Sequence, residues 1–282
     1  MRAESDRAIG QPAPWLYLFG VLAWTWTFHG VVVLTGQRLF DFPAVILALL
    51  GALGPSIVAG FLVAVGRWDP AIDTTVGEFL RRAFDPRVLP WRWYAITVGL
   101  VLVLAFVPVM LDQGALQEHG LFERGPGLFL IIGFVFGALE EPGWRGYAQE
   151  GLQRRMPVVL ASLVIGVFWA LWHLPLFFIR DTYQAGLGVG TPAFWGFVLA
   201  AVVGCPVYAW LYNGSGRITL VAVLYHALGN VVREMVPDVS NVAEVGVEAV
   251  LALVVTIAAW GLMHRPRARP QQIPGLSTEL RG

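Results

Sequence analysis

Three short clusters of polar residues interrupt otherwise apolar stretches of this sequence. They are Glu140-Glu141-Pro142-Gly143-Trp144-Arg145, Trp169-Ala170-Leu171-Trp172-His173 and His226-Ala227-Leu228-Gly229-Asn230. A carboxylate and an imidazole can remove a proton from water, while a second imidazole and an amide can donate to an oxygen that becomes negative. Together these residue types predict hydrolysis of a peptide bond by direct attack of water.

The spacing of the first cluster assigns different roles to its two carboxylates. Glu141 and Arg145 are four residues apart, so they share one face of a helix and can pair. Glu140 points about 100° away from Glu141 and has no local partner, which makes it the candidate general base. Pro142 is expected to kink the helix or to free a carbonyl. The alternative is a membrane span that ends at Leu139, with these charges among the lipid headgroups.

The second and third clusters also place polar side chains on single helix faces. Trp169 shares a face with His173, and His226 shares one with Asn230, because each pair is four residues apart. Polar groups within lipid need hydrogen-bond partners and are candidates for function. The alternatives are a structural core histidine at His173 and simple interhelical hydrogen bonding by His226 and Asn230.

Depth in the membrane favours the functional interpretation. Counted from the starts of their apolar segments, His173 lies about 24 Å deep and His226 about 12 Å deep. If the helix that carries Glu140 continues to Arg154, Glu140 lies about 21 Å deep. Allowing for helix tilt, the three side chains occupy one band near mid-membrane.

The composition indicates what kind of elements position these residues. The chain has 282 residues, of which 57% are hydrophobic and 13% charged, with no net charge. Soluble domains are about 25% charged. This composition excludes intrinsic disorder, a nucleic-acid-binding module and a typical cytosolic enzyme, and it predicts a lipid bilayer as the surroundings. The single cysteine, Cys205, excludes an intrachain disulfide.

Eight apolar segments approach the length of about 20 residues that a transmembrane helix needs. The predicted fold is therefore an all-α integral membrane protein of about eight transmembrane helices, with a buried polar site among the later ones. The segments are Pro14–Thr35, Pro43–Val65, Trp91–Leu111, one that starts near Leu128, Pro157–Ile179, Ala193–Tyr212, Ile218–Val232 and Ala243–Met263.

The distribution of arginines predicts the orientation. With eight spans, most of the 19 basic residues fall on the side that carries both termini, which we therefore expect to be cytoplasmic. Residues 1–13 and 265–282 are predicted to be cytoplasmic tails, and 14–264 a single transmembrane domain with its motif-bearing core at about 128–232. Residues 74–85 have the pattern of a short helix on the membrane surface. Gly133 and Gly137 permit close helix packing.

At these residues the sequence resembles the CPBP intramembrane proteases, a family that includes CAAX prenyl endopeptidases, bacteriocin-processing or self-immunity proteins and Abi-type proteins. The family motifs EExxxR, FxxxH and HxxxN/D correspond to the three clusters, except that Trp169 replaces the Phe. The resemblance implies an endopeptidase in which Glu140 and His173 activate water and His226 and Asn230 stabilise the oxyanion. It implies that Glu141 and Arg145 support the site, as the aromatic at position 169 would.

The cofactor and the substrate are left open by the sequence. The enzyme needs no cofactor if water is activated by side chains alone, or it uses a divalent metal such as zinc held by Glu140, His173 and His226. The expected partners are the lipid bilayer and a peptide or membrane-protein substrate, with no nucleic acid. The arginine-only basic set and the Gly/Ala-rich composition favour a bacterial cell-membrane protein. The alternatives are a non-catalytic immunity factor, a transporter or a proton-coupled carrier.

Overall fold

The computed structural model describes residues 10–69, 72–73, 75–112, 128–236 and 239–266. These residues form helices joined by short turns, and they contain no strand beyond an isolated bridge between Arg38 and Arg180. The predicted all-α class is therefore confirmed for this part of the chain. The elements are α2 (Pro14–Thr35), α3 (Ala44–Ala52), α4 (Gly54–Ala64), α5 (Val76–Phe84), η1 (Pro86–Val88), α6 (Trp91–Leu111), α8 (Leu128–Glu141), η2 (Pro142–Gln149), α9 (Glu150–Leu152), α10 (Val158–His173), η3 (Leu174–Phe178), α11 (Tyr183–Leu187), α12 (Pro192–Val203), α13 (Cys205–Gly214), α14 (Leu220–Met235), α15 (Asn241–Ala258) and α16 (Trp260–Met263).

Fewer helices meet the length and composition of a membrane span than the sequence predicted. Within the described residues these are four helical segments, or five if the bent pair of α3 and α4 is one span. The four are Pro14–Thr35, Trp91–Leu111, Val158–Phe178 and Pro192–Gly214. The prediction of eight spans is thus not supported, although an all-α membrane protein is.

The shortfall has a physical reason in two of the remaining segments. Helix α8 has 14 residues and gives way to the charged η2, and α14 has 16 residues and carries the third polar cluster. Helix α15 carries two glutamates, and it is not among the candidate membrane spans. The orientation, the limits of the domain and tails, and the bacterial source stay predictions, and residues 1–9 and 267–282 lie outside the described part.

The bend between α3 and α4, which is 53°, is stabilised by the neighbouring helix α2. Pro55 has no N–H, so the Gly51 carbonyl one turn earlier lacks its usual helical donor. Side chains of α2 donate to carbonyls at this bend: Trp24 to Leu50, Thr25 to Gly51 and His29 to Ala48. The break in this span is therefore matched by polar groups on α2, as buried backbone requires.

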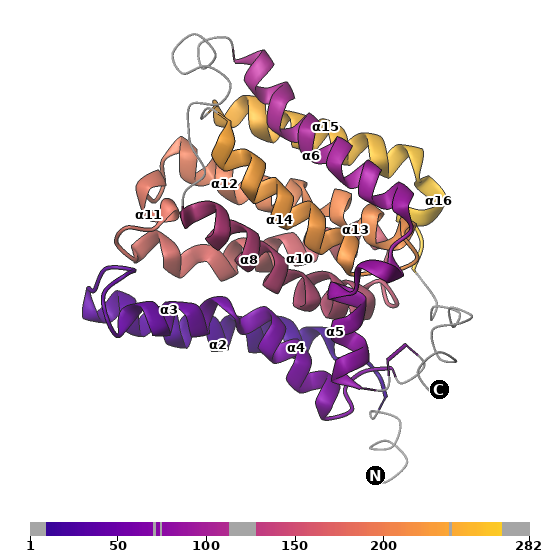
Figure 1. Ribbon diagram of the computed structural model, residues 1–282, viewed down its shortest axis with the longest axis horizontal. Coiled ribbons are helices and arrows are strands. Elements are labelled where there is room, and N and C mark those ends of the chain that lie inside the picture. The colour runs from indigo at the N-terminus through magenta and orange to yellow at the C-terminus, as the bar shows by residue number, and fades with distance from the viewer. Residues whose placement is uncertain (1–9, 70–71, 74, 113–127, 237–238, 267–282) are drawn as a thin grey trace.

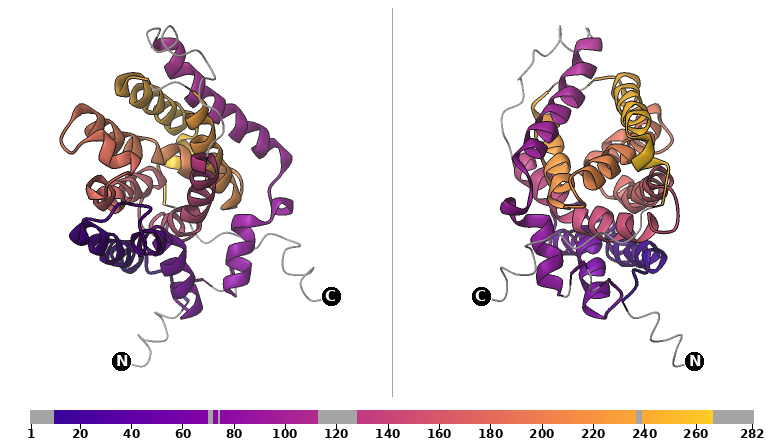
Figure 2. Two further views of the ribbon diagram at one scale, coloured as in Figure 1. Left: turned by 60° about the vertical axis from the view of Figure 1, so that its left-hand side comes forward. Right: turned by 90° about the vertical axis from the view of Figure 1, so that its right-hand side faces the viewer.

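The helices that carry the three clusters lie in the middle of the molecule. In Figure 1, α2, α3 and α4 lie on one side, α8 and α10 come next, and α6, α15 and α16 lie on the far side. Both views of Figure 2 keep α2 to α4 and α15 on opposite sides. Helix α14 packs against α8 and α6, and α10 packs against α2, α12 and α13. The polar clusters are consequently surrounded by helices.

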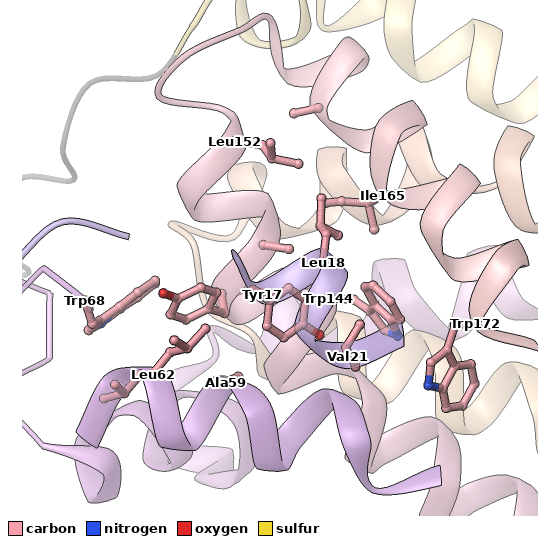
Figure 3. Close-up of a cluster of buried hydrophobic side chains, with 14 of the residues drawn as sticks. Tyr17, Leu18, Val21, Ala59, Leu62, Trp68, Trp144, Leu152, Ile165 and Trp172 are labelled. Atoms are coloured by element: carbon pink, nitrogen blue, oxygen red, sulfur yellow. The ribbon is translucent and has the colours of Figure 1, made fainter. Parts of the chain in front are cut away.

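A buried aromatic cluster fixes η2 against α2 and α10 (Figure 3). The ring of Trp144 packs edge-on against Tyr17, with ring centroids 5.7 Å apart, and against Trp172 at 6.3 Å. Trp172 also donates through Nε1 to Thr25 Oγ1 at 2.7 Å. Because Trp172 immediately precedes His173, this packing fixes the end of α10 where that histidine lies.

The helix expected on residues 74–85 is present as α5, although no observation places it on a membrane surface. Thr75 caps it by accepting a hydrogen bond from Glu78 N at 3.1 Å. At its other end, Arg87 and Arg81 both donate to Asp85, and these hydrogen bonds lower the pKa of the Asp85 carboxyl below its usual range. The acid group thus fastens the turn that leads into α6.

Candidate active site

The two adjacent carboxylates lie where α8 changes into the wide turns of η2. Glu140 is 5% exposed and Glu141 is fully buried. Residues from Pro142 to Gln149 form a π-helix, a rare conformation that frequently occurs at functional sites. Ser56 Oγ on α4 donates to the Leu139 carbonyl beside this transition. The charges therefore lie within the protein, and the alternative of a span that ends at Leu139 among the headgroups is not what the structure shows.

Glu141 and Arg145 form the pair that their spacing predicted. Arg145 Nη1 donates to Glu141 Oε1 at 2.9 Å, and both side chains are at most 1% exposed. The guanidinium lies over the ring of Tyr208, 3.8 Å from its centroid, and 4.9 Å from the ring centroid of Trp169. Tyr208, on α13, was missed by the sequence analysis because it belongs to none of the three motifs.

His173 lies at the last residue of α10, with its ring orientation fixed. Its Nδ1 lies 2.8 Å from the backbone carbonyl of Trp169. A carbonyl can only accept, so Nδ1 carries a hydrogen and the neutral ring keeps its lone pair on Nε2. Such a nitrogen can accept a proton from water. Phe197, which packs edge-on against this ring at 5.1 Å, is a second neighbour that no motif indicated.

His226 is held by the carboxylate of Glu141. Its Nδ1 lies 2.8 Å from Glu141 Oε1, so it too donates through Nδ1. In the neutral ring Nε2 is then an acceptor, and His226 can donate to an oxyanion only as an imidazolium with both nitrogens protonated. Glu141 therefore accepts hydrogen bonds from both His226 and Arg145.

Asn230 lies one turn further along α14, against the small residues of α8. Its Nδ2 donates to the Gly133 carbonyl at 2.9 Å, which leaves one amide hydrogen for another acceptor. A Cβ atom added to Gly137 would lie 2.9 Å from Asn230 Nδ2 and 3.1 Å from His226 Cδ2. Gly133 and Gly137 thus allow α14 to approach α8 as closely as the sequence suggested.

Three of the four predicted catalytic side chains surround the indole of Trp169. Its Nε1 donates to Glu140 Oε2 at 2.7 Å. The ring centroids of His173 and His226 lie 5.6 Å and 5.3 Å from that of Trp169, both in edge-on geometry. Asn230 is linked to this group through α8. The structure therefore brings together residues that are up to about 90 positions apart in the sequence.

A metal centre at this site would need at least three ligands that converge on one point. Within the described residues, no group of three or more His, Cys, Asp or Glu side chains is arranged to hold a metal ion. One oxygen of Glu140 and the Nδ1 atoms of His173 and His226 already have protein partners. Metal-bound histidines also donate through their other ring nitrogen, so these hydrogen bonds do not decide for or against a metal held by Glu140, His173 and His226.

The fold and the site define the class: an all-helical membrane protein with a buried carboxylate–histidine centre. Residues 123–232 match the family model described as type II CAAX prenyl endopeptidase Rce1-like. The chain is also similar to CAAX prenyl protease 2 of Methanococcus maripaludis, with 25% identity over 227 residues, covering 75% of this chain and 81% of that protein. These matches confirm the resemblance to the CPBP intramembrane proteases.

Proposed function

We propose that this protein is an intramembrane endopeptidase that hydrolyses a peptide bond of a membrane-associated peptide or protein. The observation that carries the proposal is the convergence of Glu140, His173 and His226 around Trp169, within a helical bundle. Glu140, with one oxygen already fixed, and His173, with a free Nε2 lone pair, can each accept a proton. Both are suited to activate a water molecule.

The reaction follows from the hydrogen bonds described above. Water attacks the carbonyl carbon of the substrate, and its proton passes to Glu140 or to His173 Nε2. The carbonyl oxygen becomes an anion, which the His226 imidazolium and the second amide hydrogen of Asn230 stabilise. The carbon–nitrogen bond then breaks, and the departing amine takes up the proton that the water lost. Glu141 orients His226 by accepting from its Nδ1, and Arg145 in turn fixes Glu141.

The substrate class is the next part of the proposal. The family description and the relative from M. maripaludis both refer to CAAX prenyl proteolysis. The lipid group of such a peptide would hold it in the bilayer, beside the helices of the enzyme. We therefore propose a lipid-anchored peptide, prenylated or otherwise membrane-associated, as the substrate to test.

The test is cleavage of matched peptides by the purified full-length protein in lipid nanodiscs. Peptides with and without a prenyl group are incubated with the enzyme, and mass spectrometry identifies the products. We expect one defined bond to be cut, and the cut to disappear with His173→Gln. Glu248→Gln is the control, since it changes a side chain with a buried oxygen on α15, outside the site. Equal cleavage by the His173→Gln protein would contradict the proposal and favour a non-catalytic membrane protein.

A further inference from the structure

The side chain of Trp169 makes a contact that the family motif does not require. In the motif this position is Phe, and an aromatic ring there could serve for packing alone. Here the indole Nε1 donates to Glu140 Oε2 at 2.7 Å, while the backbone carbonyl of the same residue accepts from His173 Nδ1 at 2.8 Å. Phe could supply the carbonyl but not the indole donor.

The direction of this indole N–H is fixed by the side chains that pack around the ring. The guanidinium of Arg145 lies 4.9 Å from the ring centroid. The rings of His226 and Tyr208 pack edge-on at 5.3 Å and 5.9 Å. A ring held in this way presents its N–H at a constant position, so the carboxylate that accepts from it is held as well.

We infer that Trp169 is a positioning residue that orients the Glu140 carboxylate through its indole N–H. The inference rests on the proposed function. A hydrogen bond from N–H to an ionised carboxylate is about twice as strong as one between neutral groups. By occupying Oε2 it leaves Oε1 as the oxygen that can accept from the attacking water. Trp169 thus supplies the aromatic ring of the motif and, in addition, a hydrogen bond that orients Glu140.

Replacement of Trp169 by Phe tests the inference kinetically, because it keeps an aromatic ring and the backbone carbonyl. We expect kcat to fall about tenfold or more, as loss of a charge-assisted hydrogen bond implies, with KM almost unchanged. Incorporation of 3-benzothienylalanine at position 169, which keeps the indole shape without the N–H, should give the same loss. A kcat within twofold of the wild-type value in both variants would overturn the inference.

Trp68 provides a matched control. Its Nε1 also donates to a buried carboxylate, Asp73 Oδ2, at 3.1 Å, but at the junction of α4 and α5 rather than in the site. Trp68→Phe therefore removes an indole–carboxylate hydrogen bond without touching Glu140. We expect its kcat to match the wild-type value. A similar fall in both tryptophan variants would show a general effect of instability and would overturn the inference.

A measurement that does not depend on cleavage separates this inference from the proposed function. In protein labelled with ¹⁵N-tryptophan, Trp169→Phe identifies the indole resonance of Trp169. Glu140→Gln replaces the charged acceptor with a neutral one, and we expect it to move that resonance upfield while leaving the resonance of Trp68 in place. An unmoved Trp169 resonance would refute the hydrogen bond. If the resonance moves but Glu140→Gln still cleaves peptides normally, the proposed function fails, and with it the catalytic role of Trp169.

Discussion

Replacement of Gly137 by Ala should push α14 away from α8 and so displace His226 and Asn230, without removing any functional group. A Cβ at this position would lie 2.9 Å from Asn230 Nδ2, 3.1 Å from His226 Cδ2 and 3.2 Å from the Cα of Ala227. The first distance is shorter than real Cβ contacts, and the last involves the backbone of α14, which must retreat by a few tenths of an ångström. His226 and Asn230 would then move away from α8 and from Glu141.

The expected magnitudes follow from these contacts. Overpacking costs about 1–3 kcal/mol, and the better helix propensity of Ala returns about 1 kcal/mol, so the free energy of unfolding should fall by about 0–2 kcal/mol. Catalysis is more sensitive, because misplacement by about 1 Å can cost a hundredfold. For a shift of a few tenths of an ångström we expect kcat to fall about tenfold.

The assay combines reversible unfolding in mixed micelles with single-turnover cleavage. Gly229→Ala is the control, because Gly229 also lies on α14 and a Cβ there would meet nothing within 4 Å. It should leave cleavage unchanged. If Gly137→Ala cleaves as fast as Gly229→Ala, the close approach of α14 to α8 does not position the oxyanion donors, and the reasoning is refuted.

Three further predictions concern the contacts that stabilise the fold in and around the site. Glu141→Gln leaves the buried guanidinium of Arg145 without its carboxylate, so the free energy of unfolding should fall by about 3 kcal/mol and cleavage should be lost. An unchanged unfolding midpoint would contradict the pairing. Gly143→Ala should prevent stable folding, measured as a loss of the monodisperse peak in gel filtration, because its Cβ would overlap the carbonyl of Pro55. Since its arginine partners lower the pKa of Asp85, the stabilisation by its carboxylate is complete at neutral pH and is lost as the pH falls below about 4. Proteolysis near α5 should accordingly increase in acid, and Asp85→Asn should show that increase already at pH 7.

The sequence predicted the pairing of nearby side chains better than it predicted the number of spans. The four-residue spacing of Glu141 and Arg145 brings them together whatever the surrounding fold, because it is a property of the helix itself. The pairing of Glu141 with His226 depends on the packing of α8 against α14, which the sequence indicated only through Gly133 and Gly137. The grouping of Glu140 with His173 and His226 was predicted from the order of the three motifs along the chain.

The missed features depend on tertiary contacts. Tyr208 and Phe197 face the site from α13 and α12, but nothing in their local sequence distinguishes them from other buried aromatics. The expectation of eight spans failed because apolar length alone does not show where a helix changes to the π conformation or bends. The tautomers of His173 and His226 could be assigned only once their Nδ1 partners were known.

The central claim is that Glu140 takes part in the activation of water. Its most direct test is the single-turnover rate of peptide cleavage by Glu140→Gln in lipid nanodiscs, beside wild-type protein and with folding and substrate binding measured on the same samples. Loss of a general base typically costs a factor of about 10² to 10⁴, and we expect a loss in that range with binding retained. A folded Glu140→Gln protein that binds and cleaves the peptide at the wild-type rate would contradict the account.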